Sequence, residues 1–161
     1  MAEEKKIKNK DKWLSYQVAY SMINAAIKND CPLQAITIEE SILADRLWSV
    51  LHVGMAIKEE NELGTLGKAL REWNKEKNEN AKLFDQEMES LRPLIADWWH
   101  ERNALIHGIA KSYQGRGPEI KAEEFRSRAS KAAKEGLCLA NKVKDWVQKK
   151  TRLLKRRKTN A

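Results

Sequence analysis

The chain has 161 residues, of which 42% are hydrophobic and 34% charged, with 7 glycines, 3 prolines and a net charge of +8. At roughly 100–200 residues per domain this length predicts one domain, and the composition excludes collagen-like and Pro/Gly-rich disordered chains. No window approaches about 18 uncharged apolar residues, and the first residues lack the apolar core of a signal peptide, so we expect a cytoplasmic protein without a membrane span.

Two long helices are predicted in the first third of the chain. The first covers residues 12–28 and ends before Pro32, because proline disfavours helical geometry in the residue before it. The second covers about 34–58, and Thr37 followed by Glu40 is a possible cap for its start. The expected core stripes are Trp13, Leu14, Val18, Met22, Ile23 and Ile27 in the first helix, and Ile38, Ile42, Leu47, Trp48, Leu51 and Met55 in the second.

The middle of the chain predicts shorter elements. A loop over 61–67 leads to a short helix over 68–74, a polar exposed stretch over 75–80 and a helix over 81–90. Pro93 suits the first turn of a new helix over about 94–110, and the loop over 112–118 follows it. Two cysteines, Cys31 and Cys138, are too few for a disulfide scaffold and lack metal spacing, so we interpret them as reduced packing residues.

The last helix begins near residue 120, passes Trp146 and frays over 155–158. Residues 142–158 hold nine basic side chains and one acid, whereas residues 1–141 hold 22 of each sign. Such a stretch attracts phosphate backbones by counterion release without reading sequence, although a solubilising helix end is the plainer interpretation. The basic residues assigned here to RNA contact are Lys149, Lys150, Arg152, Lys155, Arg156 and Arg157.

These elements predict an all-α bundle of four to five main helices in up-down packing, with a basic C-terminal tail. We expect a helical domain over 1–150 and the tail over 151–161. Most enzyme signatures are absent from the sequence: there is no Walker loop, no HExxH and no GxSxG. The three histidines lack the companions of a zinc site, so we expect neither a metal nor a cofactor.

One polar cluster stands out in the helix over 94–110. His100 and His107 are seven residues apart, which places them within about 20° of each other on a helix. Asn103 lies between neighbouring turns of that stripe, and Arg102 lies about 140° round from His107 with a side chain long enough to wrap back. Such a strip in an apolar helix is costly unless it faces water, a partner or a ligand. A half-exposed helix with an incidental histidine is the alternative.

The run from Arg102 through Asn103 to His107 resembles the R-x(4–6)-H motif of the HEPN superfamily (higher eukaryotes and prokaryotes nucleotide-binding domain), which often has Asn directly after the Arg. The segment TLGKAL over 65–70 also resembles a run that precedes the motif helix in some members. The helical pattern is similar to the family over about residues 11–150 and leaves the last ten or so residues uncovered. The H-x-Y extension of some HEPN toxins is missing, because Ile109 stands where the tyrosine would be.

The resemblance implies a bundle that homodimerises through its motif helices and cleaves RNA without a metal, in toxin–antitoxin or antiviral defence. His107 would exchange protons with the RNA, Arg102 would stabilise charge on the phosphate, and Asn103 would orient either group. An antitoxin or other regulator would be a separate protein.

Several residues are assigned supporting roles. Acidic residues of the second helix sometimes line the HEPN cleft, so Glu40 is a candidate, although a solvated face also explains it. His100 and Arg116 are candidates for RNA contact. Trp98 and Trp99 could stack on bases, but core or dimer packing is the stronger interpretation.

Two other functions stay open from the sequence. The first is a non-catalytic HEPN-like adaptor that binds RNA or a partner protein. The second is a DNA-binding helical domain, which rests only on the basic tail and lacks a turn before its would-be recognition helix.

Overall fold

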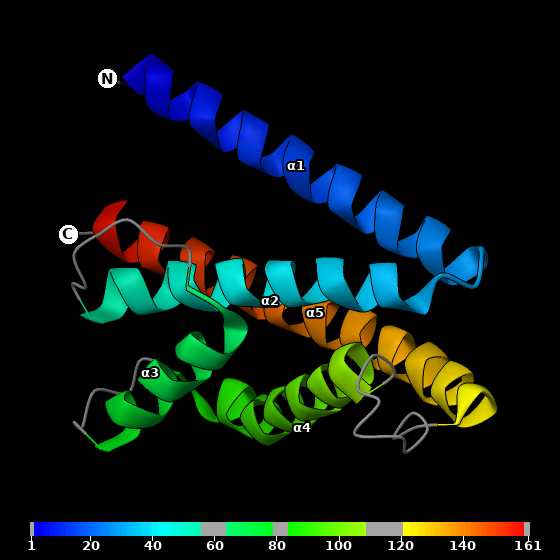
Figure 1. Cartoon of the computed structure of the whole chain (residues 1–161). Helices are drawn as coiled ribbons and strands as arrows, with labels where there is room; N and C mark the ends of the chain where they lie inside the picture. The colour runs from blue at the N-terminus through cyan, green and yellow to red at the C-terminus, as the bar shows by residue number, and fades with distance from the viewer. Residues whose placement is uncertain (1, 56–63, 79–83, 109–120, 160–161) are drawn as a thin grey trace.

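The computed structural model describes residues 2–55, 64–78, 84–108 and 121–159, with side chains described at 10–51, 64–75, 84–108 and 121–150. Over these residues every regular element is an α-helix, which confirms the all-α prediction (Figure 1). The five helices of this part of the chain are α1 (Ala2–Lys28), α2 (Pro32–Met55), α3 (Leu66–Asn78), α4 (Gln86–Gly108) and α5 (Ala122–Thr159). None of them is both long enough and apolar enough to cross a lipid bilayer.

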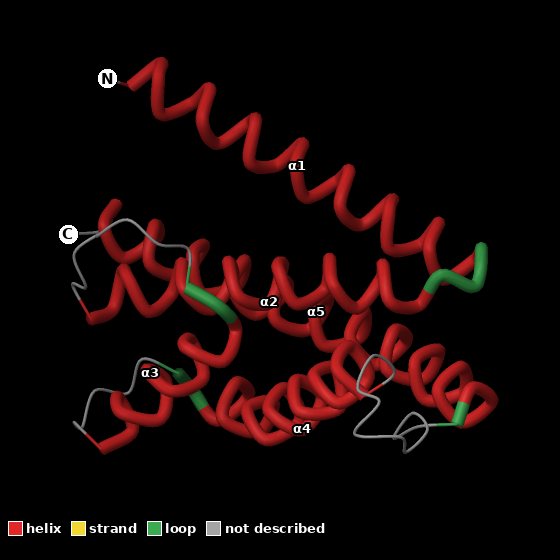
Figure 2. Tube along the Cα trace, in the orientation of Figure 1, coloured by secondary structure: helices red, strands yellow, loops and turns green. Residues whose placement is uncertain are grey.

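Helices α2 and α5 form the centre of the bundle, and the other helices pack on this pair (Figures 1 and 2). Helix α2 contributes large buried side chains such as Leu43 and Leu47, whereas α5 contributes small ones such as Ala132 and Ala140. Small side chains on one partner let two helix axes approach closely. Helix α2 therefore contacts α1, α3 and α5, while α4 packs mainly on α5.

The turn between α1 and α2 confirms that Pro32 ends the first helix. Asp30 has a positive φ of 54°, and the Cys31 N–H donates to the Ala26 carbonyl at 2.8 Å, which closes α1. Pro32 then occupies the first position of α2, where its missing N–H costs nothing. The Thr37–Glu40 cap was wrong, because α2 starts five residues earlier and the Thr37 hydroxyl donates to the Leu33 carbonyl inside the helix.

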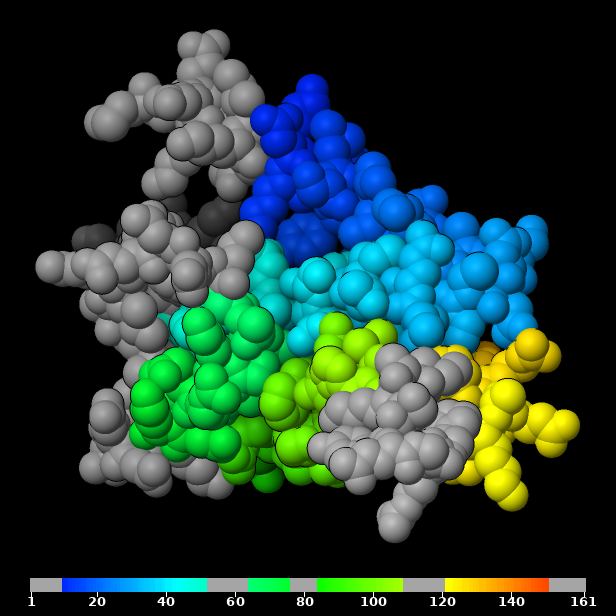
Figure 3. Space-filling model, viewed as in Figure 1, coloured from blue at the N-terminus to red at the C-terminus, as the bar shows by residue number. Residues whose placement is uncertain are grey.

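The face of α1 that packs on the bundle differs from the prediction. Ile23 is buried, but Trp13, Leu14, Val18 and Met22 are 44–59% exposed. Two tyrosines face the bundle instead. The Tyr16 hydroxyl donates to the Asp45 carboxylate on α2, and the Tyr20 hydroxyl donates to the Ala140 carbonyl on α5 at 3.2 Å. These partners let the two rings be half-buried at little cost in unpaired polar groups. In the space-filling view, α1 lies along one edge of the molecule (Figure 3).

The prediction of two helices meeting at Pro93 was also wrong. Helix α4 is continuous, starts at Gln86 and contains Pro93 on its exposed side. Met88, Leu91, Ile95 and Trp98 form one buried stripe that runs past the proline. The proline removes one backbone hydrogen bond, but packing on both sides of it keeps the helix axis continuous.

An aromatic cluster positions α3 and the start of α4 against α5. The Trp73 and Phe84 rings lie 4.3 Å apart between centroids, and the Phe84 and Trp146 rings lie 5.6 Å apart. The Trp146 indole N–H donates to Asp85 at 2.8 Å, and Asp85 also accepts the Met88 N–H at the start of α4. The second half of α5 is thereby held beside the beginning of α4.

The structure also differs from the prediction at the two cysteines and at the C-terminal ends of α3 and α5. Both cysteines are free and exposed, so they are not core packing residues as predicted. Helix α3 extends four residues beyond the predicted end, to Asn78, and α5 continues to Thr159 rather than fraying over 155–158.

Gly136 of α5 sits where α5 meets α2 and α4. A Cβ at this position would overlap the Glu39 carboxylate and come within 2.7 Å of the Trp98 ring. We expect Gly136→Ala to lower the free energy of unfolding by about 1–3 kcal/mol, because it overpacks a buried contact although alanine favours helices. Urea unfolding measures this, with Glu135→Ala as the exposed control. Equal stability of Gly136→Ala and the parent would show that the contact is loose.

Candidate functional site

Arg102 is directed towards the interior of the bundle. Its Nη2 lies 2.5 Å from the Glu40 carboxylate of α2, and the two side chains are only 16% and 18% exposed. Its Nε is buried without a hydrogen-bond partner among the described residues. The structure therefore brings Glu40 beside Arg102 and links α4 to α2 through this ion pair.

Asn103 connects Arg102 to the histidine stripe. The Arg102 Nη1 donates to Asn103 Oδ1 at 2.9 Å. Asn103 lies three residues after His100 and four before His107, so the three side chains share one side of α4. The amide of Asn103 is half-buried, and both histidines are exposed.

Arg102 and His107 do not face one another within one chain. We expected the long Arg102 side chain to wrap back towards His107, but it extends to Glu40 on the other side of the helix. The reason is electrostatic: a partly buried guanidinium is stabilised far more by a carboxylate than by an imidazole. The His100 ring packs beside the Trp99 ring, with centroids 5.0 Å apart.

The ion pair lies beside a hollow between α2 and the start of α3. Its volume is about 430 Å³, and Glu40, Asp45 and Thr65 are among its lining residues. The segment 65–70 also packs on α4, because a Cβ at Gly67 would lie 2.5 Å from the Trp99 ring. The run that resembles the HEPN pre-motif segment therefore lies against the motif helix.

One strong contact beside the motif was missed by the sequence analysis. Arg128 of α5 binds Glu101 through two nitrogens, at 2.8 and 2.9 Å, and also contacts Glu124 at 3.1 Å. This hydrogen bonding lowers the pKa of Glu101 below its usual range. The i,i+4 spacing of Glu124 and Arg128 was readable from the sequence, but the bond to Glu101 was not. It fixes α5 against the helix turn that carries Arg102.

Two basic residues near the end of α5, Lys149 and Lys150, lie far from the motif. Lys149 pairs with Glu87 at 3.5 Å, and Lys150 lies 3.9 Å from Asp85. Glu87 precedes His107 by twenty residues on α4, which corresponds to about 30 Å along the helix axis. The predicted RNA contacts of Lys149 and Lys150 are therefore at the opposite end of α4 from the histidines.

The remaining predicted residues fall into two groups. Trp98 is buried and donates its indole N–H to the Ala132 carbonyl at 2.8 Å, which confirms the packing interpretation. The other group lies outside the described side chains: Arg116, Arg152, Lys155, Arg156 and Arg157.

In the part of the chain that the structure describes, no group of three His, Cys, Asp or Glu side chains is placed to hold a metal ion. Comparison with protein-family models, with curated proteins and with solved structures gave no match.

Proposed function

We propose that the protein is a metal-independent endoribonuclease of the HEPN type, with Arg102 and His107 as catalytic residues and Asn103 in support. One observation carries the proposal: Arg102 is held by Glu40 and Asn103, and Asn103 lies one helical turn before the exposed His107. A guanidinium fixed in this way is preorganised to meet a phosphate with its remaining N–H donors.

The reaction uses the nucleophile that RNA itself carries. A base removes the proton from the 2′-OH, and the 2′-oxygen attacks the adjacent phosphorus while the bond to the 5′-oxygen breaks. An acid returns a proton to that 5′-oxygen, which leaves a 2′,3′-cyclic phosphate and a 5′-OH. An imidazole can act as either group near neutral pH. Arg102 stabilises the extra negative charge on the phosphate during the attack.

Two copies of the chain would supply the two histidines of the site. Arg102 and His107 lie about 140° apart on α4, so one chain does not direct both at a single phosphate. The outer side of α4 carries His100, Ala104 and His107, all exposed. Pairing of this face with its symmetry copy would place two histidines about one phosphate, one as base and one as acid.

A non-catalytic adaptor that binds RNA or a partner protein is the second candidate. The observation that favours it is the ion pair itself, because Glu40 already neutralises Arg102 and lies away from His107. In both functions the basic end of α5 raises RNA affinity and association rate without specifying sequence.

Cleavage of a mixed RNA pool in EDTA tests the proposal. We expect the parent protein to cut RNA and leave cyclic phosphate and 5′-OH ends, and His107→Ala protein purified in the same way to leave the RNA intact. Retention of bound RNA without cleavage by either protein would favour the adaptor. Equal cleavage by both would place the activity in a contaminant or at another site, and the assignment of His107 would be wrong.

A further inference from the structure

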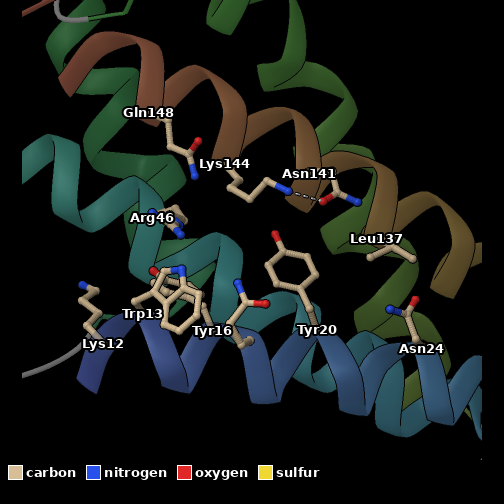
Figure 4. Close-up of a pocket in the computed structure, with 11 residues that line it drawn as sticks. Lys12, Trp13, Tyr16, Tyr20, Asn24, Arg46, Leu137, Asn141, Lys144 and Gln148 are labelled. Carbon is tan, nitrogen blue, oxygen red and sulfur yellow. Dashed lines mark hydrogen bonds between the residues drawn. The ribbon is translucent and has the colours of Figure 1, made fainter. Parts of the chain in front are cut away.

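A second polar hollow lies on the side of the bundle formed by α1, α2 and α5 (Figure 4). Its volume is about 490 Å³, within the range of small-molecule sites. None of its lining residues comes from α4. Arg46, its contribution from α2, lies six residues after Glu40, which places it about 120° away around that helix. Helix α2 therefore separates this hollow from the Arg102 site.

Three cations line the hollow, and none of its lining residues is acidic. Lys12 is already paired with Asp45 at 3.1 Å, next to the hollow. Lys144 donates to Asn141 at 2.9 Å, and its carboxylate neighbour Asp145 is 3.8 Å away and 65% exposed. The hollow thus presents a positive charge on Lys144 that is only weakly compensated.

Arg46 is the least satisfied of these cations. Its guanidinium carbon lies 3.8 Å above the centre of the Tyr16 ring. Its Nε is buried without a hydrogen-bond partner, and no described carboxylate forms an ion pair with it. A half-buried arginine without an acceptor is costly unless a bound anion supplies one. The fork of an arginine matches phosphate oxygens especially well.

Aromatic side chains stand beside these cations. Tyr16 and Tyr20 use their hydroxyls within the fold, and Tyr20 projects from α1 towards Lys144 and Asn141 (Figure 4). Trp13 lines the same hollow and is 59% exposed. A large exposed indole next to phosphate-binding cations is an arrangement on which a nucleobase can stack.

We propose that this hollow binds a nucleoside phosphate, with the base against Trp13 and the phosphate held by Arg46 and Lys144. The four side-chain amides among the lining residues supply donors and acceptors for the base or ribose. The same chemical unit exists as a free nucleotide and within an RNA strand. Binding here does not depend on ribonuclease activity, because the residues are separate from Arg102 and His107.

Titration calorimetry with the full chain tests this site, using AMP, GMP, CMP and UMP as probes. We expect at least one of them to saturate the protein below about 1 mM. Adenosine, as the matched nucleoside for AMP, and inorganic phosphate are each expected to bind at least tenfold more weakly than the nucleotide. No saturation by any of the four, or equal binding of inorganic phosphate, would overturn the proposal.

Variants locate the binding. We expect Lys144→Met and Trp13→Leu to weaken nucleotide binding at least tenfold, with Arg46→Met as a third variant whose folding is checked by circular dichroism. Lys131→Met is the control, because Lys131 is 76% exposed and lies outside the hollow. Unchanged affinity in folded Lys144→Met and Trp13→Leu proteins would show that the nucleotide binds elsewhere.

Two further experiments distinguish a free nucleotide from an RNA strand as the ligand, and this hollow from the site around Arg102 and His107. If a single-stranded oligoribonucleotide displaces the bound nucleotide, the hollow accepts a nucleoside phosphate within an RNA strand. If the oligoribonucleotide does not displace it, the ligand is the free nucleotide. Nucleotide binding is expected to persist in His107→Ala protein, whatever the outcome of the cleavage assay. Loss of nucleotide binding in that variant would contradict the assignment to this hollow.

Discussion

We expect His107→Ala to reduce the rate constant for RNA cleavage by at least about 100-fold, because a positioned general acid or base contributes about 10²–10⁴ to rate. Arg102→Ala should cause a loss of similar size, since it removes a charge-stabilising donor from the transition state. Single-turnover cleavage of a labelled oligoribonucleotide in EDTA measures both effects. His107 is exposed, so its replacement should leave the melting temperature unchanged.

Arg102→Ala requires a second variant, because it leaves the Glu40 carboxylate without its partner. Arg102→Lys keeps a positive charge near Glu40 but loses the planar fork, so we expect it to fold normally and still cleave slowly. His100→Ala is the matched histidine variant on the same stripe, and we expect a higher KM with little change in kcat. A fully active Arg102→Lys enzyme would show that a point charge suffices and that the bidentate geometry has no role.

Mixed dimers of parent and variant chains test the two-histidine site by a second measurement. When His107→Ala and parent chains are mixed in equal amounts and allowed to exchange, about a quarter of symmetric dimers hold two parent chains. We expect the cleavage rate to fall towards that fraction of the parent's rate. A fall to one half would indicate that each chain acts alone, and the two-histidine mechanism would be wrong.

The second large effect concerns Glu39, the buried acid one residue before Glu40. Its side chain is fully buried with both oxygens unpartnered among the described residues, and this burial raises its pKa to about 8. The folded chain holds this proton more tightly than the unfolded chain does. The contribution of Glu39 to stability is therefore greatest below the ordinary pKa of 4.5 and is lost as pH rises from 4.5 to about 8.

Glu39→Gln removes this ionisation while nearly keeping the shape of the side chain. At 1.36 kcal/mol per pKa unit, we expect the variant to gain roughly 3 kcal/mol over the parent at pH 7, relative to their difference near pH 4. That corresponds to a melting temperature higher by about 6–12 °C. Thermal unfolding across pH 4–8 measures the effect. Parallel curves for parent and variant would show that Glu39 is ionised and solvated in the folded protein.

Glu135→Gln is the control for this experiment. Glu135 is 52% exposed on α5 and makes a loose surface pair with Lys131 at 3.8 Å. Its replacement should change stability by at most about 0.5 kcal/mol at any pH. A pH-dependent gain in both variants would point to a general effect of lowering negative charge instead of to the burial of Glu39.

The helical elements were predictable because their signals are local. Pro32 and the residues before it end α1 without help from the rest of the chain. The shared side of His100, Asn103 and His107 follows from 3.6 residues per turn. Pro93 does not end a helix as predicted, because the buried stripe of α4 offsets the local penalty of a proline inside a helix.

The partners of polar side chains were not predictable in the same way. Tyr16 and Tyr20 replace Leu14 and Val18 on the inner side of α1 because Asp45 and the Ala140 carbonyl accept their hydroxyls. Those acceptors lie on α2 and α5, so nothing near the tyrosines in the sequence indicates them. The hollow beside Arg46 was missed for the same reason, since its residues come from three helices.

The sequence by itself determined that the chain is helical, where most of its helices lie, and that Arg102, Asn103 and His107 lie within two turns of one of them. Only the tertiary structure decided that Arg102 turns inward to Glu40 while His107 faces outward, and that the neighbouring Glu39 is buried. The physical reason is that backbone hydrogen bonding repeats along one helix, whereas burial and ion pairing depend on which other helices pack against it.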